Sequence, residues 1–230
     1  MFKECSARHI DVKHFDTSSV KEIEMMFSYI HVDIIDMTNF NLQNVSSMSF
    51  LFSGSTIGEI RFKGIKTSNV NGMLRMFKNA KVGKVDLSGL DTSGVTSMTE
   101  MFTNCNIEDL DFSKFDTHNV LHMYRMFAFF NIKRLDLRNF KFMSSVDLIE
   151  AFEGCHADEI NLSGVTIPDS AVTEAMFKDC KSLFSVNNFR NFNTKYLIGN
   201  ATNIINVGTY VYNYGGQFKE GDCYSDKNGS

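Results

Sequence analysis

Apolar and polar positions recur along this chain with a fixed period of 25 residues. Phenylalanine marks the period, with every step equal to 25 residues: Phe2, Phe27, Phe52, Phe77, Phe102, Phe127, Phe152 and Phe177. Most of these phenylalanines directly follow a methionine, as in Met101-Phe102. No insertion interrupts the series, and such self-similarity is the sequence signature of repeat architectures. The chain is therefore predicted to be a stack of similar structural units.

Each unit carries the pattern of one short strand. Apolar residues stand 17 and 15 positions before the phenylalanine, and a polar residue, usually aspartate, lies between them. Residues Val85–Leu87 and Leu110–Phe112 are two examples of this arrangement. Alternation of apolar and polar residues is typical of a strand with one buried face.

A second stretch of each unit has helical spacing. Val95 is followed by Met98 and then by the Met101-Phe102 pair, so apolar residues recur at steps of three and four. This spacing places them on one face of a helix of about two turns. Asp91–Ser93 precedes the stretch, and these residue types are preferred helix N-caps. The unit is therefore predicted to be strand, turn, short helix, turn.

The predicted fold class is α/β: a right-handed solenoid of about seven 25-residue leucine-rich-like repeats, each a short parallel strand plus a short helix. One unit cannot bury its apolar stripe alone, whereas stacked units close a continuous core. The methionine and phenylalanine positions are interpreted as core rather than as a ligand-binding aromatic box. Phe102 is therefore expected to be almost fully buried.

Three regions are predicted along the chain. The repeat solenoid covers residues 1–181, where the register holds. Residues 182–214 are rich in asparagine and aromatic residues and are interpreted as a C-terminal capping segment, with a strand at the alternating residues from Tyr210. Residues 215–230 are polar and glycine-rich, which is typical of a disordered tail.

The repeat resembles a known family. Residues 85–127, VDLSGLDTSGVTSMTEMFTNCNIEDLDFSKFDTHNVLHMYRMF, look like the BspA-like leucine-rich repeat, whose usual pattern is LDLS-x-FDTSNVT-x-M-x-x-MF-x-x-C. The resemblance covers residues 1 to about 181. It implies a surface protein that contacts a host or partner molecule and has no catalytic residues. The units here are one residue shorter than the commonest form, and no export signal or wall anchor is visible, so the localisation stays open.

The composition of the chain argues against several classes of function. The 230 residues carry a formal net charge of −4, which argues against a nucleic-acid-binding face. Five cysteines without a CxxC pair indicate neither a disulfide framework nor a zinc site. No apolar run approaches the roughly 20 residues that span a bilayer. No spacing indicates a catalytic dyad or a phosphate loop, so we expect neither an enzyme nor a cofactor.

Two groups of side chains suggest metal chemistry. Asp86, Asp111 and Asp136 occupy equivalent positions in successive units and could hold a cation through their oxygens. Bonds to the backbone or to the hydroxyl groups of Ser88 and Ser113 are the favoured alternative.

His118 and His122 lie four residues apart on the predicted helix, a spacing that suits two metal ligands. No third ligand is evident, so exposed histidines are expected and no metal site is predicted.

Two further sets of equivalent positions are informative. Cys155 and Cys180 could form a disulfide between neighbouring units, although buried thiols are favoured. The outward strand positions alternate in charge: Glu59, Lys84, Asp109, Arg134 and Glu159. Adjacent strands lie about 4.8 Å apart, so these residues are predicted to form cross-strand ion pairs that support the register.

One unit departs from the polar outer surface. Leu121, Tyr124 and Phe129 replace residues that are mostly polar in the other units, and clustered exposed aromatic residues mark contact sites. They are the predicted partner-binding residues, unless they pack on the C-terminal cap. The expected function is protein recognition or adhesion without catalysis. The alternative is a structural component of a surface or virion assembly that packs through its open solenoid edges, including self-association at the N-terminal edge.

Overall fold

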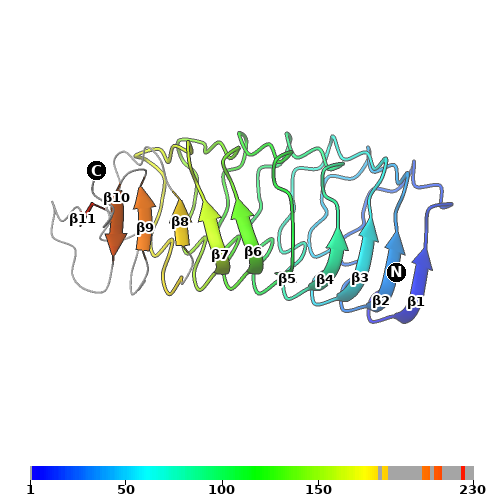
Figure 1. Ribbon diagram of the computed structural model, residues 1–230. Coiled ribbons are helices and arrows are strands. Elements are labelled where there is room, and N and C mark those ends of the chain that lie inside the picture. The colour runs from blue at the N-terminus through cyan, green and yellow to red at the C-terminus, as the bar shows by residue number, and fades with distance from the viewer. Residues whose placement is uncertain (1, 181–182, 186–203, 208–209, 214–223, 226–230) are drawn as a thin grey trace.

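The computed structural model describes residues 2–180, 183–185, 204–207, 210–213 and 224–225. They form an elongated solenoid whose strands lie side by side in one sheet (Figure 1). Seven strands repeat in parallel: β1 (Ser6–Asp11), β2 (His31–Asp36), β3 (Thr56–Arg61), β4 (Lys81–Val85), β5 (Asn106–Ile107), β6 (Asn131–Asp136) and β7 (His156–Asn161). The predicted 25-residue register is confirmed, since residues 25 apart are directly paired, as in Ile35↔Ile60. We call each 25-residue winding a coil.

The sheet continues beyond the seven regular strands. Strands β8 (Leu183–Ser185) and β9 (Ile204–Val207) add in parallel, whereas β10 (Tyr210–Asn213) and β11 (Tyr224–Ser225) pair antiparallel (Figure 1). The strand predicted from Tyr210 is thus confirmed. Apart from β8, β9 and β10, the predicted cap (182–214) lies outside the described residues, and so does the predicted tail (215–230) apart from β11.

The predicted helix is wrong, and the described residues form an all-β solenoid rather than an α/β one. Residues 98–105 instead make three overlapping tight turns. In each turn an N–H group donates to the carbonyl three residues earlier, at 3.1–3.2 Å: Met101 to Met98, Thr103 to Glu100 and Cys105 to Phe102. Glu100 and Asn104 both have a φ of 51°, as the third residue of a type II turn requires.

The stretch does not form a helix because the amides that lie between these turn bonds donate to a neighbouring coil and not to carbonyl groups four residues earlier. Every second N–H group of this stretch donates to the next coil, at 2.8–2.9 Å: Met98 to His122, Glu100 to Tyr124, Phe102 to Met126 and Asn104 to Ala128. In these tight turns, side chains three or four residues apart point into the interior, which is nearly the spacing of a helix face. Val95, Met98, Met101 and Phe102 are accordingly all fully buried, so the predicted core is right although the backbone conformation is not.

The Asp-Thr-Ser motif also has a different role from the predicted N-cap. Asp91 accepts the Ser93 N–H group at 3.0 Å and so closes a local turn of the Asx type. Thr92 is 1% exposed, and its hydroxyl accepts the Asp116 N–H group at 2.8 Å and donates to the Asp116 carbonyl at 3.0 Å. The threonine therefore ties one coil to the next.

A stack of phenylalanine rings fills the centre of the solenoid. Successive rings from Phe2 to Phe177 have centroids 4.9–5.9 Å apart and planes within 20° of parallel. Phe102 has no exposed surface and also meets Phe112 edge to face at 5.5 Å. The interpretation of the phenylalanine positions as core is confirmed.

The sheet is interrupted at β5, which pairs with β4 only through Lys81↔Asn106 and Val82↔Ile107. In the preceding coils the position of Glu108 is occupied by Gly58 and Gly83. A Cβ atom on Gly83 would lie 2.6 Å from the Gly58 carbonyl oxygen, so the close approach of β3 and β4 suits glycine alone. Glu108 carries a Cβ atom at this position, but so do Lys133 and Asp158 in the fully paired strands β6 and β7, so the missing glycine does not by itself explain the early end of the pairing.

Replacing Phe102 with alanine should lower the free energy of unfolding by roughly 3–5 kcal/mol, as for other large-to-small core changes. Its ring contacts the rings of both neighbouring coils, so its removal leaves a cavity within the stack. Chemical denaturation followed by circular dichroism measures the loss. Phe15→Ala is the control, because Phe15 is 46% exposed. A loss below about 1 kcal/mol for Phe102→Ala would contradict the stacked core.

Replacing Thr92 with valine keeps the shape of the side chain but removes its hydroxyl group. The Asp116 amide then loses its buried acceptor, and the free energy of unfolding should fall by about 1–3 kcal/mol. Thr92→Ser retains the hydroxyl and should lose markedly less in the same denaturation experiment. Equal losses in the two variants would show that the methyl group, not the inter-coil hydrogen bond, matters here.

Candidate interaction surface

The tight turns of successive coils lie side by side and build a continuous surface, and in each coil they directly precede the strand. We call it the turn face, meaning residues 98–105 and their equivalents in the other coils. Charged side chains on this face form two compact networks of ion pairs. Both networks join neighbouring coils, so the turn face is held by side chains as well as by the backbone.

The first network centres on Glu100. Its carboxylate is 8% exposed and forms ion pairs with Arg75 and Lys78 of the preceding coil. Burial raises the pKa of Glu100, but hydrogen bonds and charge from Lys78 and Arg75 outweigh it and hold the pKa below its ordinary value. Glu100 is therefore a buried anion that depends on its two cationic partners.

The second network joins three coils around Arg125. Its guanidinium lies 2.6 Å from Glu153 and 3.5 Å from Glu150, and Lys178 lies 2.9 Å from the other oxygen of Glu153. The Tyr124 hydroxyl donates to Glu150 at 3.4 Å. The two ion pairs restrict the orientation of the Arg125 side chain.

Leu121, Tyr124 and Phe129 all lie on the coil that contains Arg125. Leu121 and Tyr124 are half-buried, whereas Phe129 is 39% exposed. The Arg125 guanidinium lies over the Phe129 ring, 5.7 Å from its centroid, at a distance suited to a cation–π contact. Phe129 thus contacts Arg125 directly, and Tyr124 bonds to Glu150, one of the carboxylates beside Arg125.

The Phe129 ring has a structural contact that the sequence does not reveal. It lies against Gly154 of the next coil, where an added Cβ atom would stand 2.5 Å from the ring. Tyr29 occupies the equivalent position four coils earlier, lies against Gly54 in the same way and is 52% exposed. The sequence already places Tyr29 and Phe129 at equivalent positions, but it gave no sign of the contact with glycine that the two rings share.

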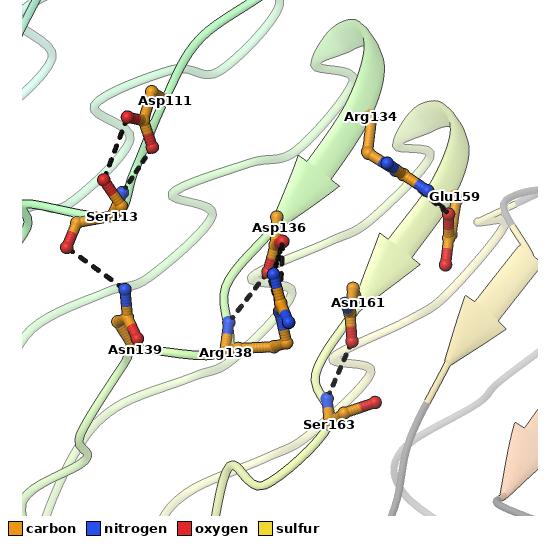
Figure 2. A network of polar contacts seen from close by, with 9 residues as sticks. All are labelled: Asp111, Ser113, Arg134, Asp136, Arg138, Asn139, Glu159, Asn161 and Ser163. Carbon is orange, nitrogen blue, oxygen red and sulfur yellow. Dashed lines mark hydrogen bonds and ion pairs between the residues drawn. The ribbon is translucent and has the colours of Figure 1, made fainter.

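The predicted ion-pair ladder on the strand face exists only in part. Arg134 and Glu159 bond across β6 and β7 at 2.9 Å (Figure 2). Glu59 lies opposite Lys84 in the register, yet its ion pair is with Arg61 of its own strand, at 3.0 Å.

Lys84 and Asp109 are not paired, because the ladder between β4 and β5 ends at Ile107. The interruption leaves a charged hollow of about 760 Å³ on the strand face, which is lined by residues that include Lys84, Asp109 and Arg134.

Asp86, Asp111 and Asp136 accept hydrogen bonds from residues two positions later in the chain. Such bonds are the alternative favoured over cation binding in the sequence analysis. Asp111 accepts the N–H and hydroxyl groups of Ser113 at 2.7 and 2.9 Å, and Asp136 accepts from Arg138 (Figure 2). Asp86 accepts the Ser88 N–H group at 2.9 Å, and this hydrogen bonding lowers the pKa of Asp86. Among the described residues no three potential ligands gather into a metal site.

The histidine and cysteine pairs have local contacts. His118 Nδ1 lies 2.6 Å from Asp116 Oδ1, and without a helix its four-residue spacing from His122 no longer brings the two rings together. The thiols of Cys155 and Cys180 are buried, each 3.6 Å from a carbonyl oxygen of the preceding coil. These contacts agree with the favoured interpretation of buried thiols.

Comparisons place the repeat in a family but supply no function. A family model described as "Mycoplasma protein of unknown function, DUF285" matches residues 1–109, 59–165 and 106–209. No curated protein and no solved structure matches the chain. Within the described part of the chain, no helix has the length and apolar character needed to cross a membrane.

Replacing Glu100 with glutamine should destabilise the protein at neutral pH, and the difference from the unaltered protein should shrink on acidification. The folded-state pKa of Glu100 lies below its ordinary value of 4.5. A carboxylate of this kind contributes stability above its unfolded pKa and loses that contribution as the pH falls through the folded pKa. Thermal unfolding between pH 7 and about pH 3 measures the change.

The exposed Glu22, as Glu22→Gln, provides the control for general charge effects. A Glu100→Gln deficit that stays constant across this pH range would contradict a stabilising ion network.

Proposed function

This chain belongs to the DUF285 family, described as Mycoplasma protein of unknown function, and we propose that it is a non-catalytic recognition module for protein contact or adhesion. The parallel solenoid offers an extended surface along which a partner can lie. The resemblance of its motif to BspA-like leucine-rich repeats supports a surface location. A right-handed winding, as in other leucine-rich-like repeats, is part of the same proposal.

The partner-binding residues of this proposal are Leu121, Tyr124 and Phe129. The observation that carries it is the exposed Phe129 ring beside an arginine that two carboxylates hold in place. Aromatic residues and arginine dominate the binding energy of protein interfaces. Side chains that are already ordered lose less conformational entropy on binding, so this region is better prepared for contact than flexible surface residues.

End-to-end assembly is the second candidate. Among the described residues β1 pairs on one side only, with β2. An unpaired strand edge is a template for pairing with another chain. The molar mass of the purified protein in solution separates the two candidates, because a monomer favours recognition and a concentration-dependent series of larger species favours assembly.

The double variant Tyr124→Ala, Phe129→Ala should bind the partner at least tenfold more weakly, because truncation of one interface hot spot typically costs about 2 kcal/mol or more. Its melting temperature should change little, since both side chains are partly exposed. The measurement is titration of the purified variants against a partner isolated with the unaltered protein.

Tyr29→Ala is the matched control, since Tyr29 occupies the same position on another coil and has the same contact with glycine. The proposal fails if the double variant unfolds at a much lower temperature, or if Tyr29→Ala weakens binding equally.

A further inference from the structure

An uncharged hollow opens where the turn face meets the beginnings of β5, β6 and β7. Its volume is about 640 Å³, and its lining consists of Asn104, Cys105, Asn106, Phe129, Asn131 and His156. No lysine, arginine, aspartate or glutamate lines it. This composition differs from that of the strand-face hollow beside β5, whose lining includes four acidic and three basic side chains.

Three of these residues form an in-register row across the sheet. Asn106 pairs with Asn131, and Asn131 pairs with His156. All three side chains are exposed, and adjacent strands place them about 4.8 Å apart. The row therefore presents polar groups at a regular spacing along the solenoid axis.

The amides in this row are available to a ligand. A carboxamide offers two N–H donors and one carbonyl acceptor, and within the described part of the chain no other side chain or backbone group bonds to those of Asn106 and Asn131. The amide of Asn104 is held in place by its bond to Asn79 Oδ1, at 3.0 Å. The hollow thus combines oriented and available amides, all of them neutral.

Phe129 adds an apolar wall to this polar row. Its ring is 39% exposed and borders the same hollow. Sugars present vicinal hydroxyl groups that both donate and accept hydrogen bonds, and their C–H groups pack on aromatic rings. An acetamido group matches the hollow further, because its amide pairs with a carboxamide and its methyl group is apolar.

We propose that this hollow binds a neutral oligosaccharide that contains N-acetylhexosamine. A phosphate-bearing or acidic ligand is typically bound by arginine or lysine side chains, and the lining contains neither. The site is distinct from protein contact at the Leu121–Tyr124–Phe129 patch, with which it shares only Phe129.

The test is titration of the purified protein with tri-N-acetylchitotriose and with N-acetyllactosamine, followed by saturation-transfer NMR. We expect binding of at least one of these sugars in the millimolar range or tighter, as for shallow sites with few anchors. The double variant Asn106→Ala, Asn131→Ala should bind at least tenfold more weakly. Thr56→Ala is the matched control, because Thr56 stands in the same row two coils before Asn106 and outside the hollow.

Two results would overturn the assignment. One is no detectable binding of either sugar at millimolar concentration, and the other is binding that the double variant leaves unchanged. The melting temperature of the double variant should match that of the unaltered protein, because the two side chains are exposed. Since Asn106 and Asn131 lie outside the protein-binding patch, loss of sugar binding with retained partner binding separates this proposal from the proposed function.

Discussion

Hydrogen bonding between successive coils is the constraint on which this molecule depends. Amide groups on the strands and on the turn face donate to carbonyl groups of a neighbouring coil, so the backbone is satisfied along the solenoid axis rather than within local helices. This arrangement holds each residue directly beside its equivalent 25 positions away. A side chain is therefore acceptable only if it can pack against the residue 25 positions away. This requirement determines which residue types occur in each column, meaning each set of equivalent positions along the stack.

The columns meet this requirement in different ways. Phenylalanine stacks on phenylalanine in the core, and buried threonine hydroxyls bond to the backbone of the next coil. Like charges cannot stack without compensation. The aspartates beside the strands therefore bond to N–H groups of their own chain, whereas Glu100 and Arg125 alternate in sign along the turn face.

Sequence periodicity was sufficient to predict the parallel solenoid, its register and its core, because a repeated column of Phe102 equivalents has no other plausible location. It was insufficient to distinguish a helix from a series of tight turns, because both return Val95, Met98 and Phe102 to the interior. The difference between the two conformations lies in the backbone hydrogen bonds. Every second N–H group of residues 98–105 donates to a carbonyl of the next coil, and the spacing of apolar residues does not reveal such bonds. Similarly, the Tyr124–Phe129 region was visible as a departure from the repeat, whereas its dependence on Arg125 and Gly154 was not.

The fixed coil length also has a genetic consequence. Each coil contacts chiefly its two neighbours and presents the same register at both of its surfaces. An in-frame duplication or loss of one whole repeat therefore joins surfaces that already fit, whereas insertion of a single residue misaligns every column of its coil. Lineages of such a protein can change the length of the molecule, and the spacing between distant surface features such as Tyr29 and Phe129, in discrete steps without redesigning the core.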